Sequence, residues 1–294
     1  MTVWQFKKNA VNLLKDSPTP SLDVDVLLQF FLNLDKTRLL MSRDESVPDD
    51  ILLKLNSAVE QRKNGLPVAY ITGHKEFFGL DFTVSPAVLI PKPDTELLVE
   101  LALNSIESNP ALNIIRVLDM CTGSGCVGIS LFKSLPPGAQ IELTLADISS
   151  DALQIAEINA ERLLKRAAAD IQFIHTNLFE NISGTFDMIV TNPPYVRHNE
   201  AVELLQDGRS EPLLALDGDV TPDSSWNGLN DGLSLIKRLV IQAKEHLAEG
   251  GHLLMETGCD NAEKTADFFT QNGFTGVKIA KDINGLLRVV SGTY

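Results

Sequence analysis

The chain has 294 residues, of which 44% are hydrophobic and 22% are charged. This length suffices for one large domain or two ordinary ones, and the composition supports a buried core, which excludes an intrinsically disordered protein. No apolar run approaches the roughly 18 to 20 residues of a membrane-spanning helix, and the N-terminal residues lack the apolar segment of a signal peptide. Three cysteines do not suggest a disulfide framework. We therefore expect a cytoplasmic protein that makes no contact with membranes.

The charge is distributed unevenly along the chain. Residues 1–85 contain 10 basic and 11 acidic residues, whereas residues 86–294 contain 15 basic and 28 acidic residues. The second part therefore carries nearly all of the net charge of −14. Such a negative surface repels phosphate backbones, so we expect no stable binding of nucleic acid.

The first part of the chain has the pattern of a helical domain. Apolar residues recur at helical spacing near the start, and further helices are predicted over about 21–34 and 48–63. Residues 75–84 alternate around a central glycine, which is typical of a hairpin, and prolines punctuate the chain after it. The predicted organisation is a helical domain over 1–65, a hairpin and hinge linker over 66–92, and a larger domain over 93–294.

From residue 94 onward, apolar strands alternate with amphipathic helices. Strands are predicted over 114–120, 141–146, 171–174, 186–191, 252–256, 276–281 and 286–290, and helices over about 94–107, 126–135, 151–167, 231–247 and 260–271. This alternation indicates an α/β domain with a doubly wound, mostly parallel sheet that ends in an antiparallel hairpin. The polar segment 217–232 is expected to be a surface loop.

A glycine-rich turn follows the first of these strands. Residues 119–128 read DMCTGSGCVG, which places a G-x-G-x-x-G motif between a strand and a helix. Its glycines allow a ligand to approach the backbone, and the helix N-terminus offers free N–H groups to a carboxylate or a phosphate. Asp147 ends the next strand, 22 residues after Gly125, where a carboxylate can accept hydrogen bonds from two ribose hydroxyls. An adenosine-containing cofactor is predicted, and a nicotinamide dinucleotide stays possible at this point.

Asp147 could instead cap the helix that follows it. Ser149 or Ser150 is better placed for that role, because the predicted helix begins at Asp151. We therefore favour the role in ligand binding.

A second motif, Asn192-Pro193-Pro194-Tyr195, follows an apolar strand. The two prolines restrict the backbone and hold Asn192 and Tyr195 at the carboxyl edge of the sheet, where ligands bind in such folds. The Asn192 side-chain oxygen and the Pro193 carbonyl can accept both hydrogens of a planar –NH₂ group, and Tyr195 can stack on that plane. This motif favours an enzyme that acts on a planar amino group over a nicotinamide-dependent enzyme.

Together, these motifs resemble those of the S-adenosylmethionine-dependent amino-methyltransferases. Within that group, the chain is similar to the HemK/PrmC family, the peptide chain release factor glutamine N5-methyltransferases. The resemblance rests on residues 70–79 (YITGHKEFFG), 88–96 (VLIPKPDTE) and 211–218 (EPLLALDG), with Asp231-Gly232-Leu233 after them. It extends from about residue 20 to the end of the chain.

The resemblance implies both the architecture and the partners. A seven-stranded Rossmann-like class I methyltransferase domain is expected to follow a small all-helical domain that helps to hold the substrate. The implied cofactor is S-adenosyl-L-methionine, with S-adenosyl-L-homocysteine as product. The implied substrates are peptide chain release factors, methylated on the glutamine of their Gly-Gly-Gln motif, and we expect the enzyme to be a monomer.

The resemblance also assigns residues by position. It implies cofactor binding by Cys121, Thr122, Gly123, Ser124, Gly125, Asp147, Asn177, Leu178 and Asn192. It implies substrate binding by Asn192, Pro193, Pro194 and Tyr195, with Asn192, Pro193 and Tyr195 as the catalytic set. In this chain Cys121 replaces a usual glycine, Asn177 a usual aspartate, Leu178 a frequent tryptophan and Lys92 a usual arginine, and residues 219–230 resemble an insertion.

Other reactive side chains carry weaker signals. Cys121 and Cys126 are not at a metal-binding spacing, so no metal site is expected. His175 and His198 have no evident partner in the sequence, and we expect both to be surface residues.

Three alternatives stay open. A paralogous enzyme that methylates a glutamine of a large-subunit ribosomal protein has a similar Cys-Thr-Gly-Ser-Gly-Cys loop, but residues 91–96 and 214–218 favour the release-factor enzyme. DNA adenine-N6 methyltransferases share a similar Asn-Pro-Pro-Tyr motif, but the negative charge and the lack of a basic recognition domain argue against one. A non-catalytic binding module would leave the motif at 192–195 without a use.

Overall fold

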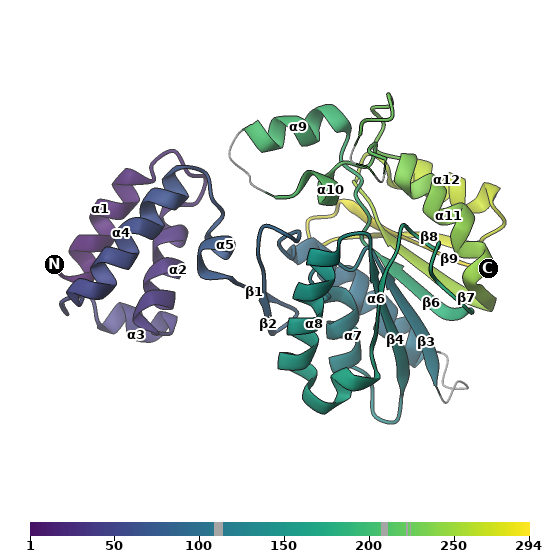
Figure 1. Cartoon of the computed structure of the whole chain (residues 1–294), viewed down its shortest axis with the longest axis horizontal. Coiled ribbons are helices and arrows are strands. Elements are labelled where there is room, and N and C mark those ends of the chain that lie inside the picture. Colours follow the sequence, from purple (N-terminus) through teal and green to yellow (C-terminus); the bar gives the residue numbers. More distant parts are fainter. Residues whose placement is uncertain (109–113, 207–210, 222, 224) are drawn as a thin grey trace. The chain divides into compact units, whose positions relative to one another are not determined.

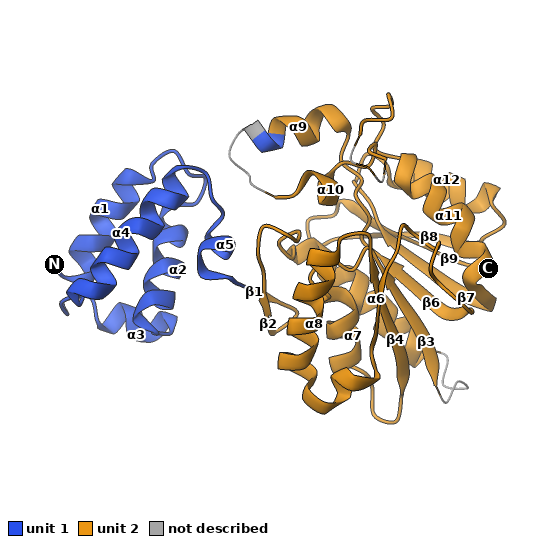
Figure 2. Cartoon of the chain, in the orientation of Figure 1, with its two compact units in different colours: residues 1–74, 204–210 blue, residues 75–203, 211–294 orange. Residues whose placement is uncertain are grey.

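A computed structural model describes residues 1–108, 114–206, 211–221, 223 and 225–294. The chain divides into two compact units, residues 1–74 with 204–210 and residues 75–203 with 211–294 (Figure 2). In sequence, the first boundary falls between residues 74 and 75. The hairpin that we predicted as part of a separate 66–92 linker therefore belongs to the second unit, where Phe77 and Phe82 are buried in its core.

The first unit is helical. It contains α1 (Val3–Leu13), α2 (Pro20–Leu32), α3 (Lys36–Met41), α4 (Asp49–Lys63) and α5 (Val68–Thr72). Its core packs side chains such as Leu27, Leu28 and Leu55, none of which is exposed to solvent. The Asp23 carboxylate is bound by Arg62 at 2.7 Å, which joins α2 to α4. The sequence does not predict α3 and α5 because helices this short do not complete an amphipathic repeat.

The second unit contains a seven-stranded sheet beside a small two-stranded one. The small sheet pairs β1 (His74–Phe77) with β2 (Leu80–Thr83). The strands of the large sheet are β3 (Ile115–Met120), β4 (Ile141–Asp147), β5 (Gln172–His175), β6 (Phe186–Thr191), β7 (Leu247–Glu256), β8 (Thr275–Lys281) and β9 (Leu287–Thr293). Their spatial order is β5-β4-β3-β6-β7-β9-β8, and β9 runs antiparallel to both of its neighbours. The predicted parallel sheet with an antiparallel end is confirmed.

Helices cover both faces of this sheet (Figure 1). On one face lie α6 (Glu96–Glu107), α7 (Cys126–Lys133) and α8 (Ser150–Leu164), and on the other lie α11 (Ser234–His246) and α12 (Ala262–Gln271). Successive side chains of a strand point to opposite faces, so Val117 packs in the first core and Leu118 in the second. This arrangement explains why the strands are continuously apolar, because both of their faces are buried.

Short elements complete the second unit. They are the 3₁₀ turns η1 (Pro93–Thr95) and η2 (Lys165–Asp170) and the helix α10 (Leu213–Leu216), whereas α9 (His198–Gln206) begins in the second unit and ends in the first. Across the described residues, no helix combines the length and the apolar composition needed to cross a membrane.

The prediction of a surface loop over 217–232 is wrong for its first residues. Asp217 and Asp219 are almost fully buried, whereas residues 225–230 are exposed. Asp219 accepts hydrogen bonds from the Gly232 N–H and the Ser234 hydroxyl, each at 2.8 Å. Polar residues are buried here because each carboxylate has donors from the same segment, which the composition alone does not reveal.

The expectation that His198 is a surface residue without a partner is also wrong. Its ring is half-buried, its Nδ1 atom hydrogen-bonds to Asp217, and it stacks on Trp226 with 4.9 Å between ring centroids. His175 is exposed as expected, and its Nε2 atom contacts the Ile148 carbonyl at 2.8 Å.

Candidate active site

A cavity of about 320 Å³ opens at the carboxyl ends of β3, β4 and β6, within the second unit. Parallel strands of a doubly wound sheet bring their carboxyl ends to one edge, which is where ligands bind in such folds. The cavity is lined by most of the residues that the sequence predicts for the site: Cys121, Thr122, Gly123, Ser124, Asp147, Asn177, Leu178, Asn192 and Pro194. Gly125, Pro193 and Tyr195 are not among its lining residues.

The glycine-rich loop between β3 and α7 is shaped by left-handed backbone conformations. Cys121, Gly123 and Gly125 have φ angles of 60°, 55° and 78°. Glycine accepts such angles without strain, which explains why a glycine is usual at the position of Cys121. At Gly125 an added Cβ would also lie 2.7 Å from Cδ1 of Ile129, one turn further along α7, and 3.3 Å from the Ala156 Cβ of α8, so this glycine allows the start of α7 to pack closely on α8. Gly125 does not line the cavity, and its assignment to cofactor binding stays a prediction from the sequence.

Asp119, the last residue but one of β3, holds the loop through its side chain. Its Oδ2 atom accepts hydrogen bonds from the Thr122 hydroxyl at 2.7 Å and the Gly128 N–H at 2.9 Å. The side chain is 1% exposed, and desolvation raises the pKa of the carboxyl to about 7. Asp119 also lines the cavity, yet our sequence analysis did not single it out. An acid at the end of a strand, directly before a glycine-rich turn, is the signal that could have identified it.

Asp147 is the last residue of β4, and its side chain also contacts the loop. Its two carboxylate oxygens accept the N–H groups of Gly123 and Ser149, each at 2.9 Å. Ser149 caps α8 by accepting the Ala152 N–H at 3.1 Å, so the helix does not need Asp147 as its cap. Burial raises the pKa of the Asp147 carboxyl, and the two backbone hydrogen bonds oppose that shift. An acidic acceptor at this place in the cavity fits a ligand that offers hydroxyl donors.

Asn177 and Leu178, which follow β5, also line the cavity. Leu178 is buried with a φ of 50°, an unusual conformation for a branched side chain, and the Thr176 hydroxyl donates to its carbonyl at 2.9 Å. Arg238, on α11, donates to Asn177 Oδ1 at 3.3 Å and lines the cavity too. This contact is not predictable from the sequence, because Arg238 lies 61 residues from Asn177 in the chain.

The segment Asn192-Pro193-Pro194-Tyr195 leaves β6 toward the same cavity. Asn192 and Pro194 line the cavity, and the Asn192 Nδ2 group donates to Thr95 Oγ1 at 3.2 Å. The Tyr195 ring is largely buried, and its hydroxyl donates to Glu256 Oε1 at 3.0 Å. Burial and the charge of Glu256 raise the pKa of Tyr195 far above its usual range, so the phenol stays protonated.

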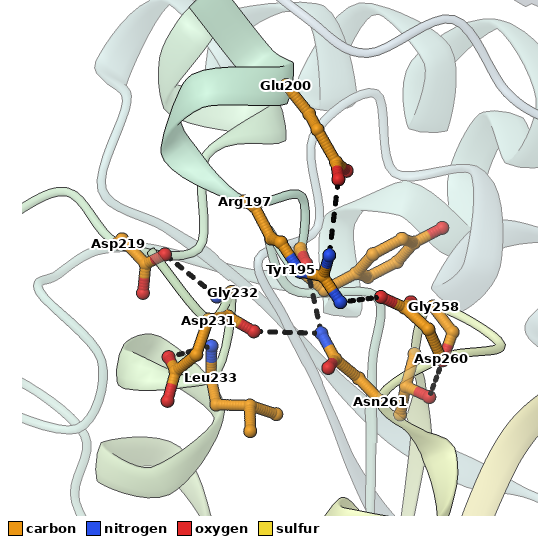
Figure 3. A network of polar contacts seen from close by, with 11 residues as sticks. Tyr195, Arg197, Glu200, Asp219, Asp231, Gly232, Leu233, Gly258, Asp260 and Asn261 are labelled. Atoms are coloured by element: carbon orange, nitrogen blue, oxygen red, sulfur yellow. Dashed lines mark hydrogen bonds and ion pairs between the residues drawn. The ribbon is translucent and has the colours of Figure 1, made fainter. Parts of the chain in front are cut away.

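The backbone of Tyr195 is held by a network of polar contacts (Figure 3). The Asn261 side chain donates to the Asp231 carbonyl at 3.2 Å and to the Tyr195 carbonyl at 3.5 Å. Gly232 has a φ of 68°, and a Cβ there would lie 2.2 Å from the Tyr195 carbonyl oxygen. Asp219 fixes Gly232 in turn through the hydrogen bond to its N–H. The Asp231-Gly232-Leu233 signature is therefore explained by close backbone contact with the motif at 192–195.

The fold and the cavity define a class I methyltransferase, and comparisons with known proteins agree. The PrmC N-terminal domain model matches residues 5–73, and the methyltransferase small domain model matches residues 95–210. A methyltransferase from Pyrococcus furiosus matches 81% of this chain and 98% of its own with a TM-score of 0.50, a likeness of fold at 15% identity.

Two relatives are similar over nearly the whole chain. The release factor glutamine methyltransferase of Koribacter versatilis is 38% identical over 296 residues, which cover 99% of this chain and 98% of the relative. That of Neisseria gonorrhoeae is 37% identical over 281 residues, which cover 95% of each. The chain belongs to the HemK/PrmC family of release factor glutamine methyltransferases. The predicted family is confirmed, and with it an enzyme that uses S-adenosyl-L-methionine.

Proposed function

We propose that this chain transfers the methyl group of S-adenosyl-L-methionine to the side-chain amide nitrogen of the glutamine in the Gly-Gly-Gln motif of peptide chain release factors. Membership of the family supports this substrate. The structural observation that carries the proposal is that Asn192 lines the same cavity as Asp147 and the glycine-rich loop. An amide acceptor and a carboxylate suited to a nucleoside then line the same cavity.

The residues around the cavity suit this cofactor. Asp147 would accept hydrogen bonds from the two ribose hydroxyls, and Leu178 would contact the adenine. Residues 121–124 would lie beside the methionine part of the cofactor. When bound, the cofactor supplies a methyl group on a positively charged sulfur. The many acidic residues of the catalytic unit are compatible with a cationic ligand.

The proposed chemistry relies on positioning. An amide nitrogen is a poor nucleophile because its lone pair is delocalised into the carbonyl group. Asn192 Oδ1 and the Pro193 carbonyl would accept the two amide hydrogens and so direct the nitrogen toward the methyl group. The same acceptors stabilise the positive charge that develops on nitrogen. The methylated nitrogen is then acidic enough to release its proton to water, so no general base is needed.

We assign to Tyr195 the task of fixing the plane of the amide. The support for this role is its rigid placement, since the hydroxyl is bound to Glu256 and the backbone is held by Asn261 and Gly232. Tyr195 is not among the lining residues of the cavity, so the contact would come from its ring edge or its backbone.

We further propose that the enzyme works in the cytoplasm, as a monomer and without stable binding to nucleic acid. A release factor as substrate supports the compartment. The excess of acidic residues over 86–294 supports the weak affinity for nucleic acid.

An intact-mass assay tests the proposed reaction. The full chain and S-adenosyl-L-methionine are incubated with an unmodified release factor, with its variant in which the Gly-Gly-Gln glutamine is alanine, and with the large-subunit ribosomal protein that the paralogous enzyme methylates. We expect one added methyl group on the unmodified release factor alone. A methyl group on the ribosomal protein instead would keep the chemistry and overturn the substrate, and no methyl group on either would overturn the proposal.

A further inference from the structure

We propose that Trp226 binds the protein substrate beside the acceptor glutamine, at the margin of the active-site cavity. The inference rests on the proposed function, because it concerns how the release factor meets the enzyme around that glutamine. It gives a use to an exposed tryptophan in the segment 219–230, which resembles an insertion into the family pattern.

Residues 219–221 and 225–227 pair as a short antiparallel hairpin, here called the Trp226 hairpin. Val220 and Trp226 are partners across it. Backbone hydrogen bonds of 2.9 and 3.1 Å lie on either side of this pair, and neither bond comes from the pair itself. In a pair of this kind the two side chains lie closest together and on the same face. The Trp226 ring therefore lies next to the Val220 side chain.

Val220 belongs to the wall of the active-site cavity. It lines the cavity together with Thr221 and with Asn192, the residue that would receive the glutamine amide. Trp226 is not among the lining residues, and 51% of its surface is exposed to solvent. A protein substrate whose glutamine reaches Asn192 leaves the rest of its chain outside the cavity, where Trp226 continues the wall.

The position of the Trp226 ring is fixed by two contacts. One face stacks on the His198 ring, with 4.9 Å between ring centroids and 11° between the ring planes. His198 is itself held through its Nδ1 atom, which lies 2.5 Å from the Asp217 carboxylate. The Trp226 Nε1–H donates to the Leu229 carbonyl, so the polar atom of the ring already has a partner. A ring ordered in advance loses little freedom on binding, and it offers its apolar surface.

The base of the Trp226 hairpin is anchored in the second unit. Asp219 is fully buried and accepts the Gly232 N–H and the Ser234 hydroxyl, each at 2.8 Å (Figure 3 shows the contact with Gly232). Gly232 in turn packs against the backbone of Tyr195. The hairpin and the motif at 192–195 therefore share one support.

The occupant that fits this surface is the substrate segment next to the glutamine. The glycines of Gly-Gly-Gln have no side chains, so their flat peptide groups can lie directly on an aromatic ring. Tryptophan is also among the residues that most often dominate the binding energy of protein interfaces. A second copy of this chain is the other occupant that the experiments test.

The first experiment compares Trp226→Ala with Trp226→Phe, which keeps a flat ring. KM for the release factor, kcat and the cofactor Kd are measured for each. We expect Trp226→Ala to raise KM about tenfold, and to change kcat and the cofactor Kd less than threefold, because the ring touches neither the reacting atoms nor the cofactor. Trp226→Phe should keep KM within about threefold of the original chain. An unchanged KM in Trp226→Ala would overturn the proposal.

Ile241→Ala is the matched control for the loss of an exposed apolar side chain. Ile241 is 50% exposed, nearly the same fraction as Trp226, and it lies on α11 outside the set of residues that line the cavity. Its replacement should leave KM and kcat as in the original chain. An equal rise of KM in Ile241→Ala would mean that KM follows surface hydrophobicity in general, which contradicts a specific role of Trp226.

A readout without turnover separates this proposal from the proposed function. The chain contains two tryptophans, Trp4 and Trp226, so labelling with 5-fluorotryptophan gives two ¹⁹F signals. The Trp226 signal is assigned by its loss in Trp226→Phe. Unlabelled release factor is then added in the presence of S-adenosyl-L-homocysteine, which has no methyl group to transfer. We expect the Trp226 signal to shift on this addition and to stay in place when the enzyme alone is concentrated.

Each other outcome has a distinct meaning. A Trp226 signal that moves with enzyme concentration alone would assign the ring to a second copy of the chain and overturn the proposal. A signal that stays in place while the release factor is methylated would also overturn it and leave the proposed function intact. If the ribosomal protein is methylated instead and moves the signal, the proposed substrate fails and the docking role of Trp226 stands.

Discussion

The two sides of the active-site cavity are held by different kinds of hydrogen bond. On the cofactor side, Asp119 and Asp147 accept backbone N–H groups of the loop and its helix at 2.9 Å. On the substrate side, Asn192 and Tyr195 are held by side chains, at 3.2 and 3.0 Å. Removal of either carboxylate leaves backbone N–H groups without a partner, so changes on the cofactor side should lower stability together with binding. Changes on the substrate side should lower turnover more than stability.

Replacement of Asn192 by alanine gives the largest expected effect on the reaction. The variant loses the acceptor that orients the amide and stabilises its developing charge, so kcat should fall about 10²- to 10³-fold. The cofactor Kd should change less than threefold, because the ribose and adenine contacts lie elsewhere. Calorimetric titration of the cofactor and single-turnover assays measure the two quantities separately. Equal losses in both would show that Asn192 serves cofactor binding instead.

Replacement of Asp147 by alanine should reverse that pattern. The variant removes the acceptor for the ribose and also leaves the Gly123 and Ser149 N–H groups without their partner. We expect the cofactor Kd to rise about 100-fold or more, since each of the two hydrogen bonds from the ribose to a charged group contributes about 1.5 to 3 kcal/mol. The melting temperature should fall as well.

Asp147→Asn is the matched control for this change. It keeps the shape of the side chain and one acceptor oxygen, so its cofactor Kd and melting temperature should lie between those of Asp147→Ala and the original chain. A Kd unchanged in Asp147→Ala would remove Asp147 from the cofactor site.

The sequence predicts those cavity residues that lie at the carboxyl ends of strands. Residues 121–124, Asp147 and Asn192 follow strand ends, and the sheet topology brings strand ends together without any knowledge of side-chain contacts. Gly125 shows the limit of this reasoning. A glycine required by a ligand and a glycine required by helix packing look the same in a motif, and the sequence does not show that a Cβ at Gly125 would lie 3.3 Å from Ala156 on α8.

The site contacts that the sequence does not predict join residues that are distant in the chain. Thr95 meets Asn192 across 97 residues, and Tyr195 meets Glu256 across 61. A single sequence holds no record of such pairs, so these two contacts are not predictable from it. Asp217 is a shorter-range example, because a segment rich in aspartate and glycine looks solvated until the donors for its carboxylates are known.

The smallest effect that we predict is on the pH dependence of stability, and it comes from Asp119 on the cofactor side. Its folded-state pKa of about 7 lies above the unfolded value of about 3.8, because burial disfavours the charged form. Between these values the folded chain keeps a proton that the unfolded chain has lost. The contribution of Asp119 to stability is therefore fully present below about pH 4 and is lost as the pH rises through 7.

Asp119→Asn cannot titrate, yet it keeps an oxygen that can accept from Thr122 and Gly128. The free energy of unfolding of the variant, relative to the original chain, should therefore rise between pH 5 and 7 by up to about 1.4 kcal/mol per pH unit. Denaturant titrations at pH 5, 6, 7 and 8 measure this difference, and all other carboxyl groups cancel in it. A difference that does not change with pH would mean that Asp119 is already charged at pH 5. The Thr122 hydroxyl and the Gly128 N–H would then donate to an ionised Asp119 carboxylate.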